Sequence, residues 1–557
     1  MNVESSTSTP TQGPDDPLLS VRDLRVVFGT PTGELEAVRG VSFDISRGET
    51  LAIVGESGSG KSTVASSINR LLAENGRIAG GSIEFDGRDL VTLQEKEMVP
   101  LRGAGIGLVP QDPMSNLNPV HRVGSQILEA LEVHGLASGR KGKRAVIELL
   151  EGVGIADAEQ RYDQYPHEFS GGMRQRVLIA MGLACEPRLL IADEPTSALD
   201  VTVQRRILDT LADRTRELGT TVLLITHDLA LAAERADRVL VMYRGEIVES
   251  GPAAQILQNP QHSYTQRLVG AAPSLSSEPL IAPQERAEPG HQEESRVLVE
   301  VADVGKSYRL RGAARRESLW AARDVSFSIS AGQTVAIVGE SGSGKSTTAK
   351  LLLGLEPVTE GSIRMGERDV TTMRSRELFA MRRRVQPVFQ NPYASLDPRY
   401  TIARSIAEPL EVHAVGDAKS RRSRARELLE LVALPPEHAE RLPHELSGGQ
   451  RQRVAIARAL ALEPELVVLD EAVSALDVIV QQQILELLVD LQQRLGLSYL
   501  FISHDLAVVN QISHMVHVMQ RGRIVESGTP AQIFTRPKEP YTRELIAAIP
   551  GTQFDAA

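Results

Sequence analysis

Two glycine-rich loops carry a lysine followed by a serine, which is the residue pattern of a phosphate-binding loop. The first, Gly55-Glu56-Ser57-Gly58-Ser59-Gly60-Lys61-Ser62, recurs letter for letter as Gly339-Glu340-Ser341-Gly342-Ser343-Gly344-Lys345-Ser346. Because glycine tolerates unusual backbone angles, such a loop can turn its N–H groups toward a phosphate, and the helix after it adds its positive dipole end. Each lysine is expected to contact the β- and γ-phosphates, and each following serine to hold Mg²⁺. The loop residues predicted to bind nucleotide are Gly55, Ser57, Gly58, Gly60, Lys61, Ser62, Thr63, Gly339, Ser341, Gly342, Gly344, Lys345, Ser346 and Thr347.

Each half of the chain also has an apolar run that ends in two carboxylates. Residues 189–192 lead into Asp193-Glu194, and residues 466–469 lead into Asp470-Glu471. In each pair the first carboxylate suits the Mg²⁺ shell, and the second can polarise an attacking water. Alone, such a run would equally be a strand that leads into a surface turn. Beside the two loops, it indicates phosphoryl-transfer chemistry.

The elements that must position these residues follow from apolar periodicity. Residues 51–54 form a predicted strand that enters the first loop, and a helix is predicted to begin at the loop's end, which is the context that the motif requires. Two further strands are predicted over residues 21–28 and 37–45. Residues 125–155 have helical periodicity and are predicted to form a helical insertion between the loop and the paired carboxylates.

Length and composition indicate two soluble globular domains. A chain of 557 residues is too long for one core, and a proline-bearing segment without apolar periodicity predicts a linker at 274–296. The predicted domains are 18–273 and 297–550, with a disordered N-terminal tail at 1–17 and a short tail at 551–557. No targeting segment and no membrane-spanning run is visible, so a cytosolic protein is expected.

The charge and cysteine content exclude several classes of site. A net charge of −11 argues against a surface built for nucleic acid. The single cysteine, Cys185, excludes an intrachain disulfide framework and any cysteine-ligated zinc or iron–sulfur cluster within this chain. Cys185 itself is predicted to be a small buried residue that precedes the strand at 189.

The order of the remaining motifs resembles the ATP-binding cassette (ABC) family. Ser170-Gly171-Gly172 precedes Asp193-Glu194, and Ser447-Gly448-Gly449 precedes Asp470-Glu471 at the same spacing. The resemblance covers essentially all of both halves. The family's Q-loop glutamine matches Gln111 and Gln390, its switch histidine matches His227 and His504, and its D-loop matches Ser197-Ala198-Leu199-Asp200 and Ser474-Ala475-Leu476-Asp477. Phe28 and Tyr308 lie where an aromatic ring would stack on adenine, and a core aromatic is the alternative interpretation at each position.

The resemblance implies an α/β fold of two tandem P-loop NTPase domains, each with a RecA-like core, an antiparallel β subdomain and a helical subdomain. It implies two composite ATP sites, because cassettes of this family pack head to tail, with the Lys loop of one facing the Ser-Gly-Gly segment of the other. ATP would hold the halves together until hydrolysis removes the γ-phosphate. Both sites are expected to hydrolyse ATP. The residues implied to be catalytic are Glu194, Glu471, His227, His504, Gln111 and Gln390, and the Mg²⁺ ligands are Ser62, Gln111, Asp193, Ser346, Gln390 and Asp470.

Local features resemble the oligopeptide/dipeptide/nickel importer branch of that family. They are a Q-loop extension at 111–119 and 390–398, Pro-His-Glu before each Ser-Gly-Gly, and a tail pattern at 260–265 and 537–542. The resemblance implies an ATPase subunit on the cytoplasmic face of the membrane, with two transmembrane permease subunits and an extracytoplasmic solute-binding protein as partners. Membrane contact would be indirect, through the permeases.

Two alternative functions stay open. One is a soluble twin-cassette ATPase that acts on the ribosome, which typically has a long, charged, helical linker between its cassettes. Here the linker is short and proline-bearing. The other is the ATPase subunit of a drug exporter, which would differ only in its partner. The transported solute stays open, because cassettes do not line the transport path.

Overall fold

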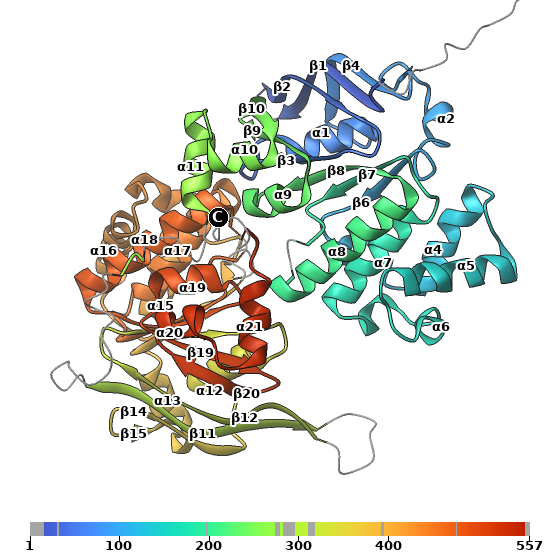
Figure 1. Ribbon diagram of the computed structural model, residues 1–557. Coiled ribbons are helices and arrows are strands. Elements are labelled where there is room, and N and C mark those ends of the chain that lie inside the picture. The colour runs from blue at the N-terminus through green and yellow to red at the C-terminus, as the bar shows by residue number, and fades with distance from the viewer. Residues whose placement is uncertain are drawn as a thin grey trace, which may run out of the picture. The chain divides into compact units, whose positions relative to one another are not determined.

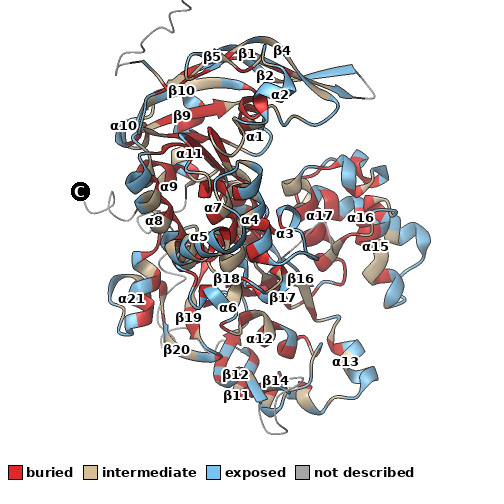
Figure 2. Ribbon diagram, turned by 90° about the vertical axis from the view of Figure 1, so that its right-hand side faces the viewer, coloured by how far each residue is buried: buried red, intermediate tan, exposed pale blue. Residues whose placement is uncertain are grey.

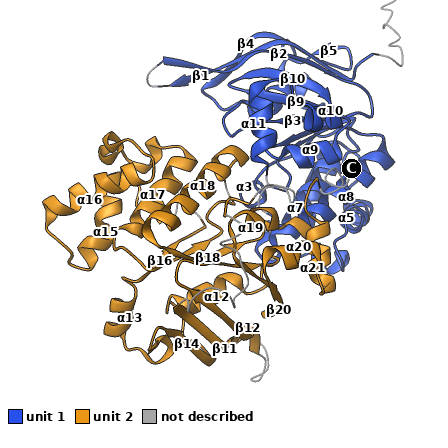
Figure 3. Ribbon diagram, turned by 60° about the vertical axis from the view of Figure 1, so that its left-hand side comes forward, with its two compact units in different colours: residues 1–199, 203–272 blue, residues 200–202, 273–557 orange. Residues whose placement is uncertain are grey.

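A computed structural model describes residues 16–30, 33–196, 199–272, 279–281, 296–309, 318–390, 395–474 and 476–551. The chain forms two compact units, which Figure 3 colours separately: residues 1–199 with 203–272, and residues 200–202 with 273–557. Each unit contains one six-stranded sheet and one four-stranded sheet, and the strand order of the first unit is repeated in the second. Figure 1 shows the chain coloured from its N-terminus to its C-terminus.

The six-stranded sheet of unit 1 is the part that positions the reactive residues. Its strand order is β10-β9-β3-β8-β7-β6, and all pairs are parallel except β9 with β10. The strands are β3 (Thr50–Val54), β6 (Ile106–Val109), β7 (Leu189–Asp193), β8 (Thr221–Thr226), β9 (Arg238–Tyr243) and β10 (Glu246–Pro252). Every residue of β8 is buried, as expected for a parallel strand covered on both faces.

The four-stranded sheet of unit 1 is antiparallel and has the order β2-β1-β4-β5. Its strands are β1 (Leu19–Thr30), β2 (Gly33–Ile45), β4 (Gly76–Phe85) and β5 (Arg88–Asp89). Side chains alternate between core and surface along it, so that Val21, Ile45 and Ile83 are buried in one core with Val64 of the helix after the loop. The predicted strands at 21–28 and 37–45 are therefore confirmed.

Helices supply the other layers of unit 1. Two of them, α4 (Val123–Val133) and α5 (Gly139–Gly152), confirm the helical insertion predicted over 125–155. The others are α1 (Lys61–Ile68), α2 (Glu95–Met98), α3 (Pro113–Asn116), α6 (Ala158–Arg161), the 3₁₀ turn η1 (Pro166–Glu168), α7 (Gly171–Leu183), α8 (Val201–Leu218), α9 (Leu229–Arg235), α10 (Ala253–Gln258) and α11 (Ser263–Ala271).

Unit 2 repeats this architecture. Its six-stranded sheet, in the order β16-β17-β18-β13-β19-β20, consists of β13 (Thr334–Val338), β16 (Val385–Val388), β17 (Leu466–Asp470), β18 (Ser498–Ser503), β19 (Met515–Gln520) and β20 (Arg523–Gly528). Its antiparallel sheet, β12-β11-β14-β15, consists of β11 (Val297–Arg309), β12 (Ser318–Ser330), β14 (Glu360–Met365) and β15 (Arg368–Asp369).

The helices of unit 2 correspond in order to those of unit 1. Figure 2 draws buried residues in red, and α17 has a long red stretch because it lies in the apolar core of the unit. The helices and 3₁₀ turns are α12 (Lys345–Leu352), η2 (Val370–Thr372), α13 (Ser375–Met381), α15 (Ile402–Val412), α16 (Ala418–Leu431), η3 (Pro436–Glu440), η4 (Pro443–Glu445), α17 (Gly448–Leu460), α18 (Val478–Leu495), α19 (Leu506–Ile512), α20 (Pro530–Thr535) and α21 (Pro540–Ala547).

Several predicted segments lie outside the described residues, namely most of the N-terminal tail at 1–17, most of the linker at 274–296, and the chain end beyond 551. Of the linker, Leu280 and Ile281 are among the described residues, and the Leu280 amide donates to the Gln511 carbonyl at 3.0 Å. Among the described residues, no helix is both long enough and apolar enough to cross a membrane.

The prediction that Cys185 is buried was wrong. The side chain is half-buried, with Sγ 3.6 Å from the Ala130 carbonyl. It lines a cavity of about 480 Å³ between helices of unit 1, together with Leu131, Leu183 and Arg214. At the corresponding positions of unit 2, Leu462 replaces Cys185 and a fully buried Leu491 replaces Arg214.

The second unit buries a histidine where the first has a leucine. His517 on β19 is 7% exposed and occupies the position of Leu240 on β9. Its Nδ1 lies 2.7 Å from Ser527 Oγ, and its ring lies 5.5 Å from the Phe327 ring. Because burial disfavours the charged imidazole, the pKa of His517 is lowered from 6.5 to about 4.

This burial predicts an acid-sensitive stability. In the unfolded chain His517 takes up a proton near pH 6.5, whereas the folded chain resists it down to about pH 4. The free energy of unfolding should therefore fall as the pH drops through this window, by at most about 3 kcal/mol. We expect His517→Leu, which copies Leu240, to remove that part of the pH dependence of the thermal unfolding midpoint between pH 7.5 and 5. The exposed His121→Leu is the control, and equal pH dependence of His517→Leu and the unsubstituted chain would contradict the prediction.

Candidate nucleotide-binding sites

The glycine-rich loop of each unit connects the central strand to a helix. In unit 1, β3 ends at Val54, the loop follows, and α1 begins at Lys61. A side chain could not replace the hydrogen of Gly55, because a Cβ there would lie 2.1 Å from the Met242 carbonyl oxygen. Gly60 has a φ of 104° and precedes the helix in a left-handed conformation. The loop therefore runs close against the neighbouring strand β9.

The lysine of each loop bends back over its own backbone. Lys61 Nζ donates to the carbonyls of Gly55 at 2.7 Å and Glu56 at 2.9 Å. Lys345 makes the same two contacts, to Gly339 at 2.7 Å and Glu340 at 2.9 Å. Burial lowers the pKa of Lys345, although the neighbouring carboxylates, Glu471 first among them, oppose the shift. A buried ammonium group beside a loop of backbone amides suits a polyphosphate ligand.

The serine after each lysine contacts the first carboxylate of the predicted pair. Ser62 Oγ donates to Asp193 Oδ1, and Ser346 Oγ donates to Asp470 Oδ1, both at 3.1 Å. Burial raises the pKa of both aspartates, and the serine hydrogen bond opposes that shift. A hydroxyl and a carboxylate oxygen at this distance fit the hard, oxygen-only donor set of Mg²⁺, which fills its other positions with water and substrate phosphate. The residues present therefore fit the metal.

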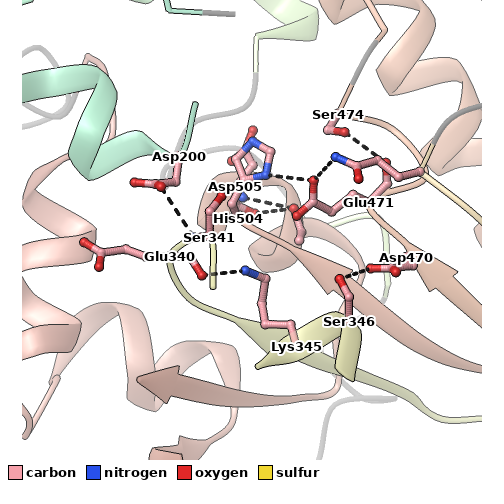
Figure 4. Close-up of polar contacts among 12 residues, drawn as sticks. Asp200, Glu340, Ser341, Lys345, Ser346, Asp470, Glu471, Ser474, His504 and Asp505 are labelled. Carbon is pink, nitrogen blue, oxygen red and sulfur yellow. Dashed lines mark hydrogen bonds and ion pairs between the residues drawn. The ribbon is translucent and has the colours of Figure 1, made fainter. Parts of the chain in front are cut away.

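The second carboxylate of each pair is held by two donors. In unit 1, Gln111 Nε2 donates to Glu194 Oε2 at 2.8 Å, and His227 Nδ1 lies 3.4 Å from the same oxygen. In unit 2 the corresponding distances to Glu471 Oε2 are 2.7 Å from Gln390 and 3.5 Å from His504. Figure 4 shows the second site, with Lys345 and Ser346 on one side and His504 beside Glu471. The structure therefore brings these predicted residues of each unit together.

Each glutamate and its histidine form an ion pair. Burial acts to raise the pKa of Glu194 and of Glu471, but the hydrogen bond and charge of the histidine outweigh it, so both pKa values are lowered. Burial likewise acts to lower the pKa of His227 and of His504, but the glutamate outweighs it, and both are raised. The contact between the two groups thus favours the ionised form of each carboxylate and the protonated form of each imidazole.

Both glutamates have a strained backbone that the sequence did not predict. Glu194 has a φ of 46° and Glu471 a φ of 50°, in the left-handed region that non-glycine residues rarely occupy. A hydrogen bond holds each one, from the Glu194 amide to the Ile225 carbonyl at 2.8 Å and from the Glu471 amide to the Ile502 carbonyl at 2.9 Å. Strain of this kind concentrates at functional sites. No feature of the residue type signals it.

The Ser-Gly-Gly segments begin the helices α7 and α17. Ser170 Oγ accepts from the Met173 amide and Ser447 Oγ from the Gln450 amide, each at 3.3 Å, so both serines are N-caps. The second glycine is required by packing, because a Cβ on Gly172 would lie 2.6 Å from Val203 Cγ1, and one on Gly449 2.3 Å from Val480 Cγ1. A Cβ on the first glycine, Gly171 or Gly448, would make only an ordinary van der Waals contact. Packing therefore does not require a glycine at this first position.

The two predicted adenine-stacking residues lie in different environments. Phe28 pairs with Leu35 across β1 and β2, and its half-buried ring packs against the core of unit 1. Tyr308 pairs with Leu319 across β11 and β12, is 38% exposed, and donates its hydroxyl to Glu356. Burial and then Glu356 raise the pKa of Tyr308 to about 12. Tyr308 is thus the more accessible of the two rings.

If Tyr308 stacks on adenine, its removal should lower the affinity only for ligands that carry the adenine base. Stacking of a base on an aromatic ring contributes about 1–3 kcal/mol, so Tyr308→Ala should weaken ATP binding about tenfold or more. It should leave the affinity for inorganic triphosphate, which has no base, unchanged. Calorimetric titration with both ligands is the measurement, and Leu319→Ala, at the exposed cross-strand neighbour, is the control. Equal losses for ATP and triphosphate would contradict the role.

Parts of two predicted motifs lie outside the described residues. They are Ser197, Ala198 and Ala475 of the D-loops and residues 391–394 of the second Q-loop extension. Of the remaining D-loop residues, Asp477 caps α18 by accepting from the Val480 amide at 3.1 Å. In the first Q-loop extension, Asp112 caps α3 by accepting from the Met114 amide at 2.8 Å.

Comparison with known families matches both halves. A family described as ABC transporter matches residues 38–197 and 322–474. A second family, described as Oligopeptide/dipeptide transporter, C-terminal region, matches residues 248–312 and 525–556. The second pair of matches includes both copies of the tail pattern found at 260–265 and 537–542.

Relatives named for glutathione import align over nearly the whole chain. The chain is 46% identical over 561 residues to the protein named Glutathione import ATP-binding protein GsiA of Escherichia coli (strain K12), and the alignment covers 96% of this chain and 89% of the relative. The protein of that name in Salmonella typhimurium is 45% identical with the same coverage. Among solved structures, a dimeric post-hydrolysis state of the ATP-binding cassette MJ0796 bound to ADP and Pi is 31% identical, with a TM-score of 0.38, over 42% of this chain and 98% of that one.

Proposed function

Because the chain belongs to the ABC transporter family, we propose that it is the ATP-hydrolysing subunit of an importer for di- or oligopeptides or similar small solutes. Support for the solute class comes from the match to the oligopeptide/dipeptide transporter C-terminal region in both halves and from relatives named for glutathione import. The importer assignment covers the whole chain, since these relatives align over 96% of it.

The proposed ATPase activity rests on one observation, namely that each unit contains the complete set of site residues. Each unit has the same six side chains: a lysine, a serine, two carboxylates, a glutamine and a histidine. The Ser–Asp, Gln–Glu and His–Glu distances agree within 0.1 Å between the two units. Neither unit lacks a charged or phosphate-contacting member of the set. Two functional hydrolytic sites are therefore proposed, rather than one functional and one degenerate site.

We assign the sites as composites of both nucleotide-binding domains, 18–273 and 297–550, which the segment 274–296 links. In each, the Lys loop of one domain and the Ser-Gly-Gly segment of the other bind one ATP with Mg²⁺. The first site joins Lys61, Ser62, Gln111, Asp193, Glu194 and His227 to Ser447, Gly448 and Gly449, and the second joins Lys345, Ser346, Gln390, Asp470, Glu471 and His504 to Ser170, Gly171 and Gly172.

Within each site the glutamate acts as the general base. Glu194 Oε2 accepts from Gln111 and His227, so its other carboxylate oxygen contacts the attacking water and accepts a proton from it. His227 stabilises the ionised carboxylate by its charge, and Gln111 orients it. Bound Mg²⁺ supplies charge neutralisation on the phosphates, with Ser62, Asp193 and the side-chain oxygen of Gln111 as its protein ligands. Glu471, His504, Gln390, Ser346 and Asp470 have the same roles in the second site.

If Glu194 and Glu471 are the general bases, replacing either one should lower ATP hydrolysis at its own site to the same extent. Glu194→Gln and Glu471→Gln should each reduce hydrolysis at their own site by roughly 10²-fold or more, because the amide cannot accept the proton of the water. The double variant should then lose nearly all steady-state ATPase activity, while ATP binding, measured by calorimetry, persists.

The exposed Glu217→Gln, on α8 away from the loop, is the matched control for loss of a carboxylate and should keep full activity. Unchanged ATPase activity in either single variant of the pair would refute two equivalent hydrolytic sites.

The proposed partners are two transmembrane permease subunits and an extracytoplasmic solute-binding protein, with this chain peripheral on the cytoplasmic face of the membrane. Family membership and the importer names of the relatives support this assembly. Closure of the two domains on ATP would then be transmitted to the permeases.

Affinity capture of the tagged full chain, solubilised in mild detergent, tests the partner class. We expect two polytopic membrane proteins in stoichiometric amount, and we expect their recovery to depend on detergent extraction of the membrane. Recovery of ribosomes in their place would refute the importer assignment and favour a soluble twin-cassette ATPase.

A further inference from the structure

The tail pattern of each half has a structural consequence at the phosphate loop. In both units the pattern ends in Tyr-Thr at the start of a short helix, α11 or α21, after the last strand of the sheet. Each tyrosine extends from that helix to the glycine-rich loop of its own unit, about two hundred residues away along the chain: Tyr264 is separated from Glu56 by 208 residues and Tyr541 from Glu340 by 201.

The contact is made to one specific peptide unit. The Glu56 amide donates to Tyr264 Oη at 2.9 Å, and the carbonyl of the same peptide unit, that of Gly55, accepts from Lys61 Nζ at 2.7 Å. The N–H of the first peptide unit of the loop is thus hydrogen-bonded to a tyrosine, and the C=O of the same unit is hydrogen-bonded to the lysine.

Unit 2 repeats the contact. The Glu340 amide donates to Tyr541 Oη at 3.1 Å, and the Gly339 carbonyl accepts from Lys345 Nζ at 2.7 Å. Two independent copies of the arrangement argue that it is a constructed feature and not a chance approach of side chains.

Both tyrosines are in a fixed environment. Tyr264 is 0% exposed and stacks on Tyr243 with ring centroids 4.2 Å apart, and Tyr541 is 7% exposed. Burial raises the pKa of Tyr541 to about 12, so its phenol remains neutral. Each amide–phenol hydrogen bond is part-buried, so water is a restricted substitute for the phenol oxygen.

A glutamate on the last strand anchors each tail helix. Glu249 on β10 accepts from the amides of Gln261 at 2.7 Å and His262 at 3.0 Å, just before α11 begins. Glu526 on β20 accepts from the amides of Lys538 at 2.8 Å and Glu539 at 3.2 Å, just before α21. Charge-assisted bonds to a pair of backbone amides fix where each helix starts, and so fix the tyrosine that follows.

We propose that Tyr264 and Tyr541 are positioning residues that orient the first peptide unit of each phosphate loop for nucleotide binding. They act through the loop and do not touch the nucleotide. Without the phenol oxygen, the peptide unit turns to find another acceptor, and the carbonyl that holds the lysine turns with it. The inference rests on the proposed ATP sites and assigns a role to the tail, which the catalytic motifs do not include.

Tyrosine-to-phenylalanine variants test the inference, because they remove one oxygen and keep the ring packing. Tyr541→Phe and Tyr264→Phe, each made in the full chain, should weaken ATP binding at their own site about tenfold, as measured by calorimetric titration in the presence of Mg²⁺. The control is Tyr499→Phe in β18, which removes the equally buried hydroxyl that donates to the Leu488 carbonyl at 2.9 Å, away from the loop. It should shift the thermal unfolding midpoint without changing ATP affinity.

Lysine variants separate this inference from the site assignment itself. If Lys345→Ala abolishes binding at one site while Tyr541→Phe and Tyr264→Phe bind ATP as the unsubstituted chain does, the positioning role is refuted and the ATP sites stand. If Tyr499→Phe lowers the affinity as much as Tyr541→Phe, the effect is general destabilisation and the inference is likewise refuted. If both Lys61→Ala and Lys345→Ala bind normally, the ATP sites themselves are refuted, and the inference with them.

Discussion

The parallel pairing of the central strands decides where every reactive side chain of each unit lies. In unit 1, Val54 at the end of β3 pairs with Thr226 at the end of β8, Ile225 pairs with Asp193 of β7, and Ala192 pairs with Val109 of β6. Because parallel strands end at the same edge, the loop, the switch histidine, the paired carboxylates and the glutamine all leave the sheet together. A shift of one residue in any of these registers would separate Ser62 from Asp193 or Gln111 from Glu194, whose contacts are only about 3 Å long.

Much of this edge could be predicted from the sequence, because its signals are local. Glycines mark a loop that needs unusual backbone angles, apolar runs of strand length mark buried parallel strands, and helical periodicity over 125–155 marks α4 and α5. The co-location of Gln111 with Glu194 was predicted by family resemblance alone. No spacing in the sequence relates these two residues, since the sheet register brings them together.

Other features depend on packing that no local signal records. The left-handed φ of Glu194 results from the turn that its amide makes toward Ile225. The bond from the Glu56 amide to Tyr264 joins the two ends of unit 1 and requires the placement of the tail helix by Glu249. Cys185 was expected to be buried because cysteine usually is, but the residues around it leave a cavity, so its exposure depends on neighbours far away in the sequence.

The internal repeat separates residues needed for chemistry from residues that only fill space. Cys185 and Arg214 border a cavity in unit 1, whereas unit 2 has Leu462 and Leu491 at the same positions. Leu240 of unit 1 is likewise replaced by the buried His517 in unit 2. The cores of the two units therefore differ. In contrast, the hydrogen bonds of the loop lysine, the serine after it and the tail tyrosine recur in both units. A core tolerates exchange of one apolar side chain for another of similar volume. A peptide unit that is hydrogen-bonded through both its N–H and its C=O needs an acceptor and a donor at fixed positions. The geometry common to the two units therefore extends beyond the catalytic motifs and includes the tail helices.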